Sequence, residues 1–306
     1  MSDLTLMEAA KGSADFQVNV VTKQIVEASP ILEYAPVRTI PGAAYKYFRE
    51  ASLGSIGYRA VGGSYIADSG VINPEVETLV ILGGEVFADN FEIATMGGTI
   101  AVKPAKYQMK SRSMGIFFSQ EFFEGDKTVT PTGLDGIRRR ITASQLINAA
   151  TGGATLTLAM IDELLDAVVG GADALFMNKT LRRKTTALVR AQTGSSLISV
   201  SADQFGRQQT HYAGVPIRIV EREDDASTIF GFDEDDGSAN LDTASIYAIK
   251  FGNQYCHVIA NSGLPSVKDF GESETRPGHL GRIEWFAGLA IEHQRAVARL
   301  YHINNA

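Results

Sequence analysis

Residues 54–70 read GSIGYRAVGGSYIADSG, and this stretch has almost nothing to bury. Five of its residues are glycine, well above the usual frequency of about 7 %. The residues on both sides have strand character, so the pattern predicts a long hairpin loosened by glycine. Because an isolated two-stranded ribbon is at best marginally stable in water, we expect a neighbouring subunit to supply the surface on which the hairpin lies.

The two flanks of this stretch predict the strands of the hairpin. Residues 43–51 mix aromatic with charged side chains, and strand character resumes over 75–89. Gly83 and Gly84 interrupt the returning strand, as a β-bulge or a bend does. The pattern therefore predicts one returning strand that is disturbed at the glycine pair.

The forty residues before the hairpin form an amphipathic arm. Ser2 is placed to cap a turn that ends near Gly12, and Ser13 to cap a helix that stops at Pro30. The apolar residues on one side of this helix are Phe16, Val20, Val21, Ile25 and Ala28. The arm thus has one apolar stripe and no partner within itself.

After the hairpin the pattern predicts a long helix. Pro104 sits where a helix tolerates proline, in the first turn, and the helix stops at Gly125. With about twenty residues at about 1.5 Å each, it spans roughly 30 Å. Its apolar residues recur at intervals of three, four and seven: Tyr107, Met114, Phe117, Phe118 and Phe122.

The second half of the chain alternates helix and strand. Gly152 and Gly153 lead into a helix with apolar residues from Leu158 to Val168, and Asn178 caps another helix. Strands are predicted at 174–177, 214–221 and 244–251, with an exposed acidic loop at 233–242. Period-two alternation over 281–303 predicts a long final strand, with Trp285 in the core; after Gln294 the pattern fits strand or helix.

Composition excludes several classes of protein. The chain has 306 residues, a net charge of −7 and a pI of about 5.3, opposite to proteins that bind nucleic acid tightly through phosphates. A single cysteine, Cys256, excludes an intrachain disulfide and agrees with a reducing cytoplasm. No secretory signal or membrane span is evident, so we expect a soluble protein made inside a cell.

The usual catalytic signatures are missing from the sequence. It has no phosphate-binding G-x-x-x-x-G-K-[ST], no G-x-S-x-G and no H-E-x-x-H. Ser55 has the wrong spacing for a nucleophile, residues 150–155 open a helix without a dinucleotide fingerprint, and 233–236 lack calcium-loop spacing. Cys256 and His257 point to opposite faces of a strand. We therefore expect no enzyme, no cofactor and no metal site.

The charged and aromatic residues left over are candidates for contacts between subunits. Basic residues cluster at 138–140 and 179–184, and we interpret both clusters as solvated helix faces or ion pairs to a neighbour, with DNA contact as the minor alternative. The predicted assembly-interface residues are Phe16, Val20, Arg49, Tyr58, Arg59, Tyr65, Arg138, Arg139 and Arg182.

In this order, the segments resemble the major capsid protein of tailed bacteriophages, which has the Hong Kong 97-type fold also found in encapsulins. The resemblance rests on IVEASPIL (25–32), LVILGGEV (79–86), FFEGD (122–126), PTGLDG (131–136), DELL (162–165), DALFMN (173–178), YAGVPI (212–217), SIYAIKFG (245–252) and RIEWFAGLA (282–290). It implies an α+β fold. The implied parts are an N-terminal arm (1–40), an extended E-loop (41–89), a P-domain with the spine helix (90–126), an A-domain (127–265) and a return through the P-domain (266–306).

The resemblance implies a structural subunit of an icosahedral virion, assembled in the host cytoplasm from pentamers and hexamers around double-stranded DNA. Some members crosslink through an E-loop lysine, but residues 47–102 contain no lysine and only Lys46 stands at the loop base, so we expect noncovalent assembly. Portal, decoration and separate scaffolding proteins are further implied partners; no membrane is. The alternatives are an encapsulin-like compartment shell and an α/β nucleotide-binding enzyme.

Overall fold

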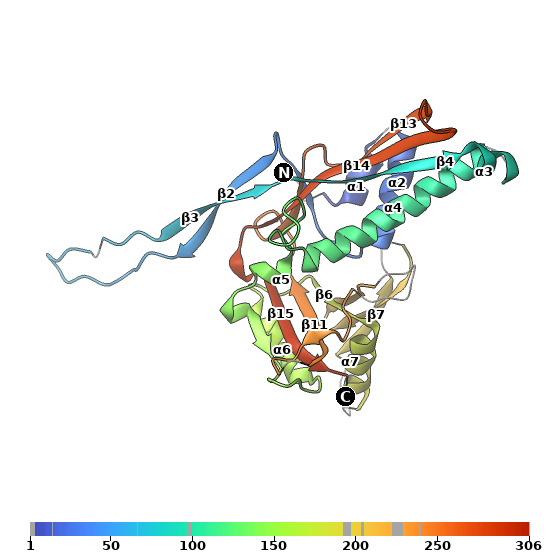
Figure 1. Ribbon diagram of the computed structural model, residues 1–306. Helices are drawn as coiled ribbons and strands as arrows, with labels where there is room; N and C mark the ends of the chain where they lie inside the picture. Colours follow the sequence, from blue (N-terminus) through green and yellow to red (C-terminus); the bar gives the residue numbers. More distant parts are fainter. Residues whose placement is uncertain are drawn as a thin grey trace.

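The computed structural model describes residues 4–13, 15–65, 67–96, 99–191, 197–202, 205–221, 229–238 and 240–305. Helices and sheets are mixed, and a long arm leaves the body on one side while a narrow tip leaves it on the other (Figure 1). The helices are α1 (Leu6–Lys11), α2 (Phe16–Ala28), α3 (Asn90–Thr95), α4 (Thr99–Glu124), α5 (Ile137–Arg140), α6 (Leu158–Ala167) and α7 (Lys179–Ala191). Short 3₁₀ turns lie at Ala143–Gln145 and Gln294–Ala296.

Strands of the described residues form three sheets. The first is the arm, in which β2 (Ala44–Ser52) pairs with β3 (Val71–Thr78). The second has β14 (Gly278–Ile291) at its centre; its other strands are β1 (Val37–Thr39), β4 (Val80–Asp89), β12 (Cys256–Ala260) and β13 (Ser266–Glu272). The third is a larger sheet of β5 (Leu146–Asn148), β15 (Val297–Asn304), β11 (Leu241–Ile249), β6 (Ala174–Met177), β9 (Val215–Ile219), β8 (Gln208–Tyr212), β7 (Ile198–Ala202) and β10 (Glu234–Asp235).

The N-terminal helices form as expected but with other caps. The Asp15 carboxylate, directly before α2, accepts a hydrogen bond from the Gln17 N–H at 2.9 Å, whereas Ser13 only accepts one from the Asp15 N–H at 3.3 Å. The prediction of a Ser13 cap is therefore wrong. Thr5 caps α1; Ser2 lies outside the described residues.

Two strands, and not one, follow the glycine-rich stretch. β3 pairs with β2, but β4 turns away at Leu79 and pairs with β14 over its whole length. The single returning strand over 75–89 is therefore wrong. The second half of this segment is apolar, and it is buried by pairing with β14; a hairpin that extends into water would leave it exposed.

Gly83 and Gly84 make no bulge, because the register between β4 and β14 runs through them without a shift. A Cβ on Gly83 would lie 2.5 Å from the backbone oxygen of Ile283, and one on Gly84 would lie 2.3 Å from the Lys110 side chain. Gly83 thus permits a close approach of β4 to β14, and Gly84 a close approach of β4 to α4; neither bends the strand.

α4 is longer than expected, with 26 residues, and Pro104 lies in its second turn. Proline there costs one backbone hydrogen bond, since only the first four N–H groups of a helix lack an intrahelical partner anyway. Met114, Phe118 and Phe122 face the core as predicted. Phe117 does not, because its side chain is 49 % exposed where it borders a hollow beside Leu82 of β4.

The main core lies where α4 packs on the sheet of β14 and reaches the larger sheet. Trp285 is 1 % exposed, with its ring 5.3 Å from that of Phe118 and its indole N–H donating to Gly263 O at 3.3 Å. Its predicted core position is confirmed. Phe123 contacts the rings of Phe176 and Tyr247 from the larger sheet, so aromatic packing joins the two sheets.

The larger sheet and the helices α6 and α7 beside it contain the elements predicted for the second half of the chain. Asn178 caps α7, since its side-chain oxygen accepts from the Leu181 N–H at 2.8 Å, which confirms that prediction. Gly152 and Gly153 form a turn with positive φ, and α6 begins only at Leu158 after its cap Thr157. The glycine turn therefore does not open a helix, so the expectation that residues 150–155 do so is wrong.

The acidic segment over 233–242 is exposed at most of its described positions, as predicted, but two of its carboxylates are buried. Glu234 is 8 % exposed in β10, and its carboxylate pairs with the Arg299 guanidinium at 2.8 Å and accepts a hydrogen bond from Ser245. Asp236 is also buried and accepts backbone N–H groups of its own turn. Arg299 on β15 supplies the charge that stabilises the buried Glu234 carboxylate.

The predicted final strand over 281–303 is two strands in two sheets. β14 ends at Ile291, a 3₁₀ turn follows, and β15 begins at Val297 beside β11 and β5. In the parts of the chain that the structure covers, every helix is too short or too polar to span a lipid bilayer.

Candidate assembly surfaces

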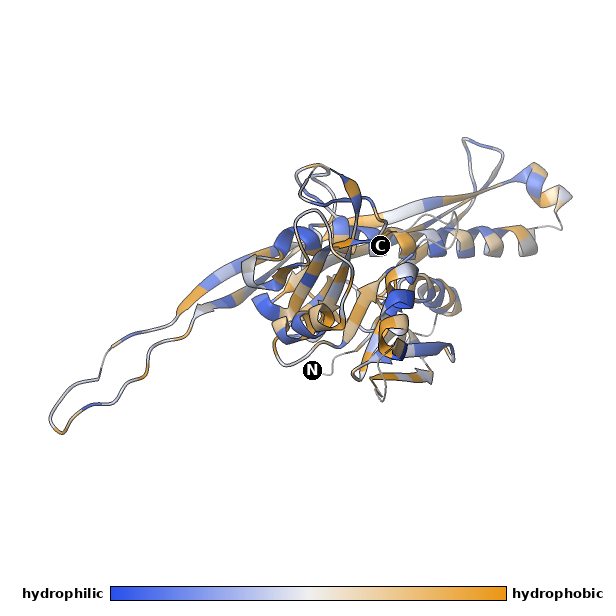
Figure 2. Cartoon of the chain, turned by 90° about the horizontal axis from the view of Figure 1, so that it is seen from below, coloured by the Kyte–Doolittle hydropathy of each residue, from blue (hydrophilic) through white to orange (hydrophobic). Residues whose placement is uncertain are grey.

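The loop of residues 53–70, called the arm tip below, extends away from the body, and each of its residues that the structure describes is exposed. Ile56, Tyr58 and Val61 are fully exposed, at 101 to 109 % of their reference area. The hydrogen bonds of its described residues lie within the loop: the Ser55 N–H and hydroxyl donate to the Asp68 carboxylate at 3.0 and 2.8 Å. Figure 2 shows the arm reaching far beyond the rest of the chain. In the isolated chain these large apolar side chains are not buried, so they contribute no hydrophobic stabilisation to the subunit.

Three predicted interface residues meet at the arm tip. The Arg59 guanidinium lies 5.1 Å from the centre of the Tyr65 ring and donates to Gly63 O at 3.3 Å. Tyr58 has no such partner among the described residues and is entirely in solvent. The tip therefore presents two tyrosines and one cation to whatever covers it.

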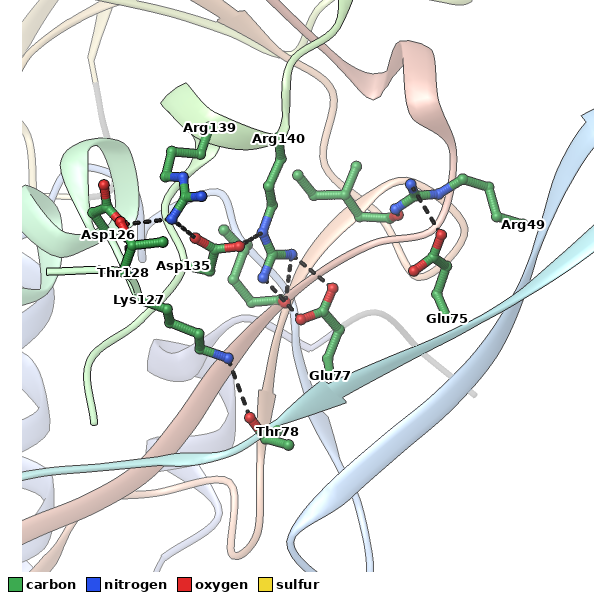
Figure 3. A network of polar contacts seen from close by, with 12 residues as sticks. Arg49, Glu75, Glu77, Thr78, Asp126, Lys127, Thr128, Asp135, Arg139 and Arg140 are labelled. Atoms are coloured by element: carbon green, nitrogen blue, oxygen red, sulfur yellow. Dashed lines mark hydrogen bonds and ion pairs between the residues drawn. The ribbon is translucent and has the colours of Figure 1, made fainter. Parts of the chain in front are cut away.

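The base of the arm is tied firmly to the body, as Figure 3 shows. Both terminal nitrogens of Arg140 donate to the Glu77 carboxylate at 2.8 Å, and one donates to Leu289 O at 3.1 Å. Lys127 donates to the Thr78 hydroxyl at 3.2 Å. A two-pronged arginine–carboxylate pair restricts direction as well as distance, so it fixes the angle at which the arm leaves.

Arg49 belongs to this base. Its guanidinium donates to Ile291 O at 2.8 Å, and the Tyr47 hydroxyl donates to the same oxygen at 3.0 Å. Glu75 lies 3.7 Å from Arg49. Burial raises the pKa of Tyr47. Arg49 is one of the predicted interface residues, but its two terminal guanidinium nitrogens have partners within its own chain.

A third anchor lies beside the first residues of β2. The Tyr45 hydroxyl donates to the Glu292 carboxylate at 2.5 Å, and Arg38 pairs with the same carboxylate at 3.2 Å. Burial raises the pKa of Tyr45 to about 12. His257 packs its edge on the Tyr45 ring, and burial lowers its pKa to about 4, so it is neutral at pH 7.

Sequence reasoning missed Arg140, Glu77 and Glu292 as anchors. The partners are far apart in the chain, with Glu77 and Arg140 separated by 63 residues, so no local spacing reveals them. The one available signal was that Glu75 and Glu77 fall on the same face of β3.

The other predicted arginines do not gather at one site. Arg139 pairs with Asp126 and lies 3.7 Å from Asp135, and Arg138 lies 3.7 Å from Glu234. These two therefore have partners at the junction of α4, α5 and the larger sheet. Arg182 lies apart on α7, half-buried.

Phe16 and Val20 border an apolar groove of about 320 Å³. The groove lies between α2, α4 and β13, and Phe16 at its rim is 79 % exposed. Val21 and Ile25, on the same helix, are instead buried against the body. The predicted stripe of α2 is thus divided into a buried half and an open end.

The Cys256 thiol is fully buried, and burial raises its pKa to about 12, so it is neither ionised nor accessible at pH 7. The described side chains contain no group of three or more His, Cys, Asp and Glu that could hold a metal ion.

No family model matches the sequence, and no curated protein matches it. Solved structures do match. An encapsulin complex of Synechococcus elongatus PCC 7942 is similar over 89 % of this chain and 86 % of its own, with 13 % identity and a TM-score of 0.62. The capsid of a native GTA particle matches over 90 % of both chains, with 14 % identity and a TM-score of 0.62.

A structure of Microbacterium phage Oxtober96 matches over 90 % of both chains, with 13 % identity and a TM-score of 0.61. Identities this low establish the fold alone. Because each match covers about nine-tenths of this chain, the matches support the mixed α+β fold over most of its length. The chain has the Hong Kong 97-type fold of phage capsid and encapsulin shell proteins.

Proposed function

We propose that this chain is the major capsid protein of a tailed bacteriophage. It assembles into the pentamers and hexamers of an icosahedral head that encloses double-stranded DNA. The observation that carries this proposal is the arm tip: its apolar side chains are fully exposed, while its base is held rigidly by Arg140 and Glu77. A fixed direction and an uncovered surface suit a contact with another subunit.

Assembly by such an arm is head-to-tail, because the arm of one copy meets a different surface on the next. Contacts of this kind close into rings when the rotation between copies permits it. A standard interface buries about 1,600 Å². Repeated around each subunit, modest contacts stabilise a closed shell through multivalency.

In this proposal the subunits hold one another without covalent bonds, since the arm tip carries no lysine. DNA is enclosed and not gripped, in keeping with the net charge of −7. Portal, decoration and separate scaffolding proteins are the expected partners in the host cytoplasm. The E-loop then ends at Thr78, since β4 belongs with β14.

A second candidate function is the shell of an encapsulin-like compartment with protein cargo. The similarity to the Synechococcus elongatus encapsulin complex, with a TM-score of 0.62, favours it as much as the phage matches favour the first. The two functions differ in what the shell contains.

Electron microscopy of the purified recombinant protein tests both. Closed shells or capsomer rings are the expected result, and a persistent monomer under all assembly conditions would exclude both functions. Particles from the native source then separate the two: nuclease-protected DNA supports the capsid, and a co-purified protein cargo without DNA supports the compartment. Boiled, reduced shells should give a single monomer band on a denaturing gel if no crosslinks form.

A further inference from the structure

Helix α7 differs in charge from the rest of the chain. It carries five basic residues and no acidic one; the basic residues are Lys179, Arg182, Arg183, Lys184 and Arg190. The whole chain, in contrast, has 35 acidic and 28 basic residues. Positive charge is therefore concentrated on one helix of an acidic protein.

The fold turns part of this charge into solvent. Leu181, Thr185 and Val189 are the buried residues of α7, so the other side of the helix is open. Arg183 and Arg190 lie on the open side and are exposed. They are seven residues apart, which is about two turns, so they share one face and lie about 10 Å apart along the axis.

Two of the five cations are used inside the subunit. The Lys179 ammonium pairs with Glu221 at 2.5 Å. The Lys184 ammonium donates to Asn304 O at 3.2 Å and lies 5.9 Å from the centre of the Phe232 ring. Burial lowers the pKa of Lys184. These two lysines stabilise α7 on the larger sheet.

The three arginines of α7 are not neutralised in this way. Within the part of the chain that the structure describes, no carboxylate forms an ion pair with Arg182, Arg183 or Arg190. Arg183 donates to the Thr180 hydroxyl of its own helix at 3.3 Å. Arg182 is half-buried beside them. The exposed pair is thus available to a negatively charged partner.

The open face of α7 has little that a protein interface needs at its centre. No large apolar side chain of this helix is exposed, and Ala187 lies between the two exposed arginines. Protein interfaces depend on a core of aromatic and apolar side chains. Contacts to nucleic-acid phosphates need cations and small polar groups. This face is therefore better suited to a phosphate backbone.

Helix α6 of a second copy is the competing partner. It carries Asp162, Glu163 and Asp166 and no basic residue. The Asp162 carboxylate already accepts a hydrogen bond from the Tyr212 hydroxyl at 2.8 Å. No large apolar side chain of α6 is exposed either, so two such helices would meet without an apolar core.

The spacing of the exposed arginines fits a DNA duplex. The major groove of B-DNA is about 12 Å wide, close to the axial distance of about 10 Å between Arg183 and Arg190. A helix lying across the groove can direct one guanidinium to the phosphates of each strand. Ala187 between them has no group that reads a base edge, so the contact is independent of sequence.

We propose that Arg183 and Arg190 of α7 bind the phosphate backbone of double-stranded DNA inside the shell, with Arg182 as a further cation beside them. This inference rests on the proposed function in that the shell contains DNA, and it adds that α7 faces the lumen. Two or three cations per subunit make a contact that salt reverses. The DNA is then touched at many points and can still leave.

Fluorescence anisotropy of the purified subunit with a labelled duplex tests the contact. Each neutralised phosphate contributes about −0.9 to the slope of log K against log salt, so wild type should give a slope of about −2 to −3. Arg183→Gln with Arg190→Gln should lower the affinity about tenfold or more at about 50 mM salt and make the slope less negative by about 2.

The matched control removes the same charge elsewhere. Arg112 on α4 and Arg276 before β14 are both exposed, and Arg112→Gln with Arg276→Gln should change the affinity less than about twofold. A duplex of unrelated sequence should bind wild type equally well. No binding by wild type, or equal binding by wild type and the α7 variant, would overturn the proposal.

Two further outcomes locate α7 in the assembly. Arg190→Cys should react with a bulky maleimide in the dissociated subunit and not in intact shells, and the native Cys256 stays silent because it is buried. Labelling of intact shells would place α7 outside and contradict the proposal. So would an α7 variant that binds DNA normally but forms no capsomer rings, since α7 then contacts a second copy.

Electron microscopy of the same preparations tests the shell function separately. If wild type forms shells but its DNA binding does not depend on Arg183 and Arg190, the α7 contact is wrong while the shell function stands. If wild type never assembles, the shell function is wrong, and the binding curves still decide whether α7 holds DNA.

Discussion

The arm tip and β14 are both extended segments, but they are placed oppositely. β14 carries Ile283, Trp285 and Leu289 into the core, and each is at most 1 % exposed. The arm tip carries Ile56, Tyr58 and Val61 into solvent without any cover. In one chain, then, apolar side chains serve two purposes. Those of β14 stabilise the subunit, and those of the arm tip are available for contact between subunits.

The two segments should differ most in how much the removal of one large side chain lowers the free energy of unfolding. Trp285→Ala should lower the free energy of unfolding by about 3–5 kcal/mol, because it leaves a cavity beside Phe118. Tyr58→Ala is the matched change in the arm tip and should stay within about 0.5 kcal/mol. Chemical denaturation of the unassembled subunit measures both. Equal losses would contradict the division of roles.

The second largest loss of stability should come from breaking the buried ion pair between Glu234 and Arg299 in the larger sheet. Glu234→Ala leaves the Arg299 guanidinium buried without its carboxylate, at a cost of about 3 kcal/mol. Replacing both by methionine should cost less than the single change, since no charge is then left buried. If the double variant is the less stable one, the pair contributes net stability and not only specificity.

The neutral His257 at the arm base should make the subunit sensitive to acid. Its folded pKa of about 4 lies below the unfolded value of about 6.5, so the unfolded state binds more protons. Its contribution to stability is complete above pH 6.5 and is lost as the pH falls toward 4. Between pH 7 and pH 5 the loss should be about 2 kcal/mol.

His257→Phe should remove this part of the pH dependence, because phenylalanine keeps an aromatic ring in the buried site and carries no group that titrates. Denaturation curves of both proteins at the two pH values isolate the effect from that of other groups. Identical pH slopes would show that His257 keeps an ordinary pKa.

The smallest effect expected in the body comes from the cap of α7. Asn178→Ala removes the acceptor of the Leu181 N–H and the donor to Phe230 O, and should cost about 1–2 kcal/mol. Asn178→Asp keeps the acceptor and should lose less. A loss no larger than that of Tyr58→Ala would show that α7 is held by packing alone.

Local patterns predicted the parts of the fold that depend on neighbours in sequence. The Asn178 cap, the core position of Trp285 and the uncovered arm tip all followed from residue type and spacing. The Ser13 cap failed because Asp15, one residue before the helix, competes better for the free N–H groups.

Local sequence patterns gave wrong predictions where the structure of a segment depends on residues far away in the chain. The break at Leu79 depends on β14, and the burial of Glu234 depends on Arg299, 65 residues away. Of the predicted interface residues, Arg49 is used within its own chain and Arg138 and Arg139 have partners there. Phe16, Tyr58, Arg59 and Tyr65 remain exposed, and their role in assembly stays a prediction.

The central claim is that the arm tip joins subunits without stabilising any one of them. Replacing residues 54–69 by Asn-Gly closes β2 and β3 with a two-residue turn and leaves the anchors at Arg49, Glu77 and Arg140 in place. Sedimentation velocity and electron microscopy compare this variant with wild type. We expect a folded subunit with an unchanged unfolding midpoint that forms no closed shells; normal shells from the shortened arm would contradict the account.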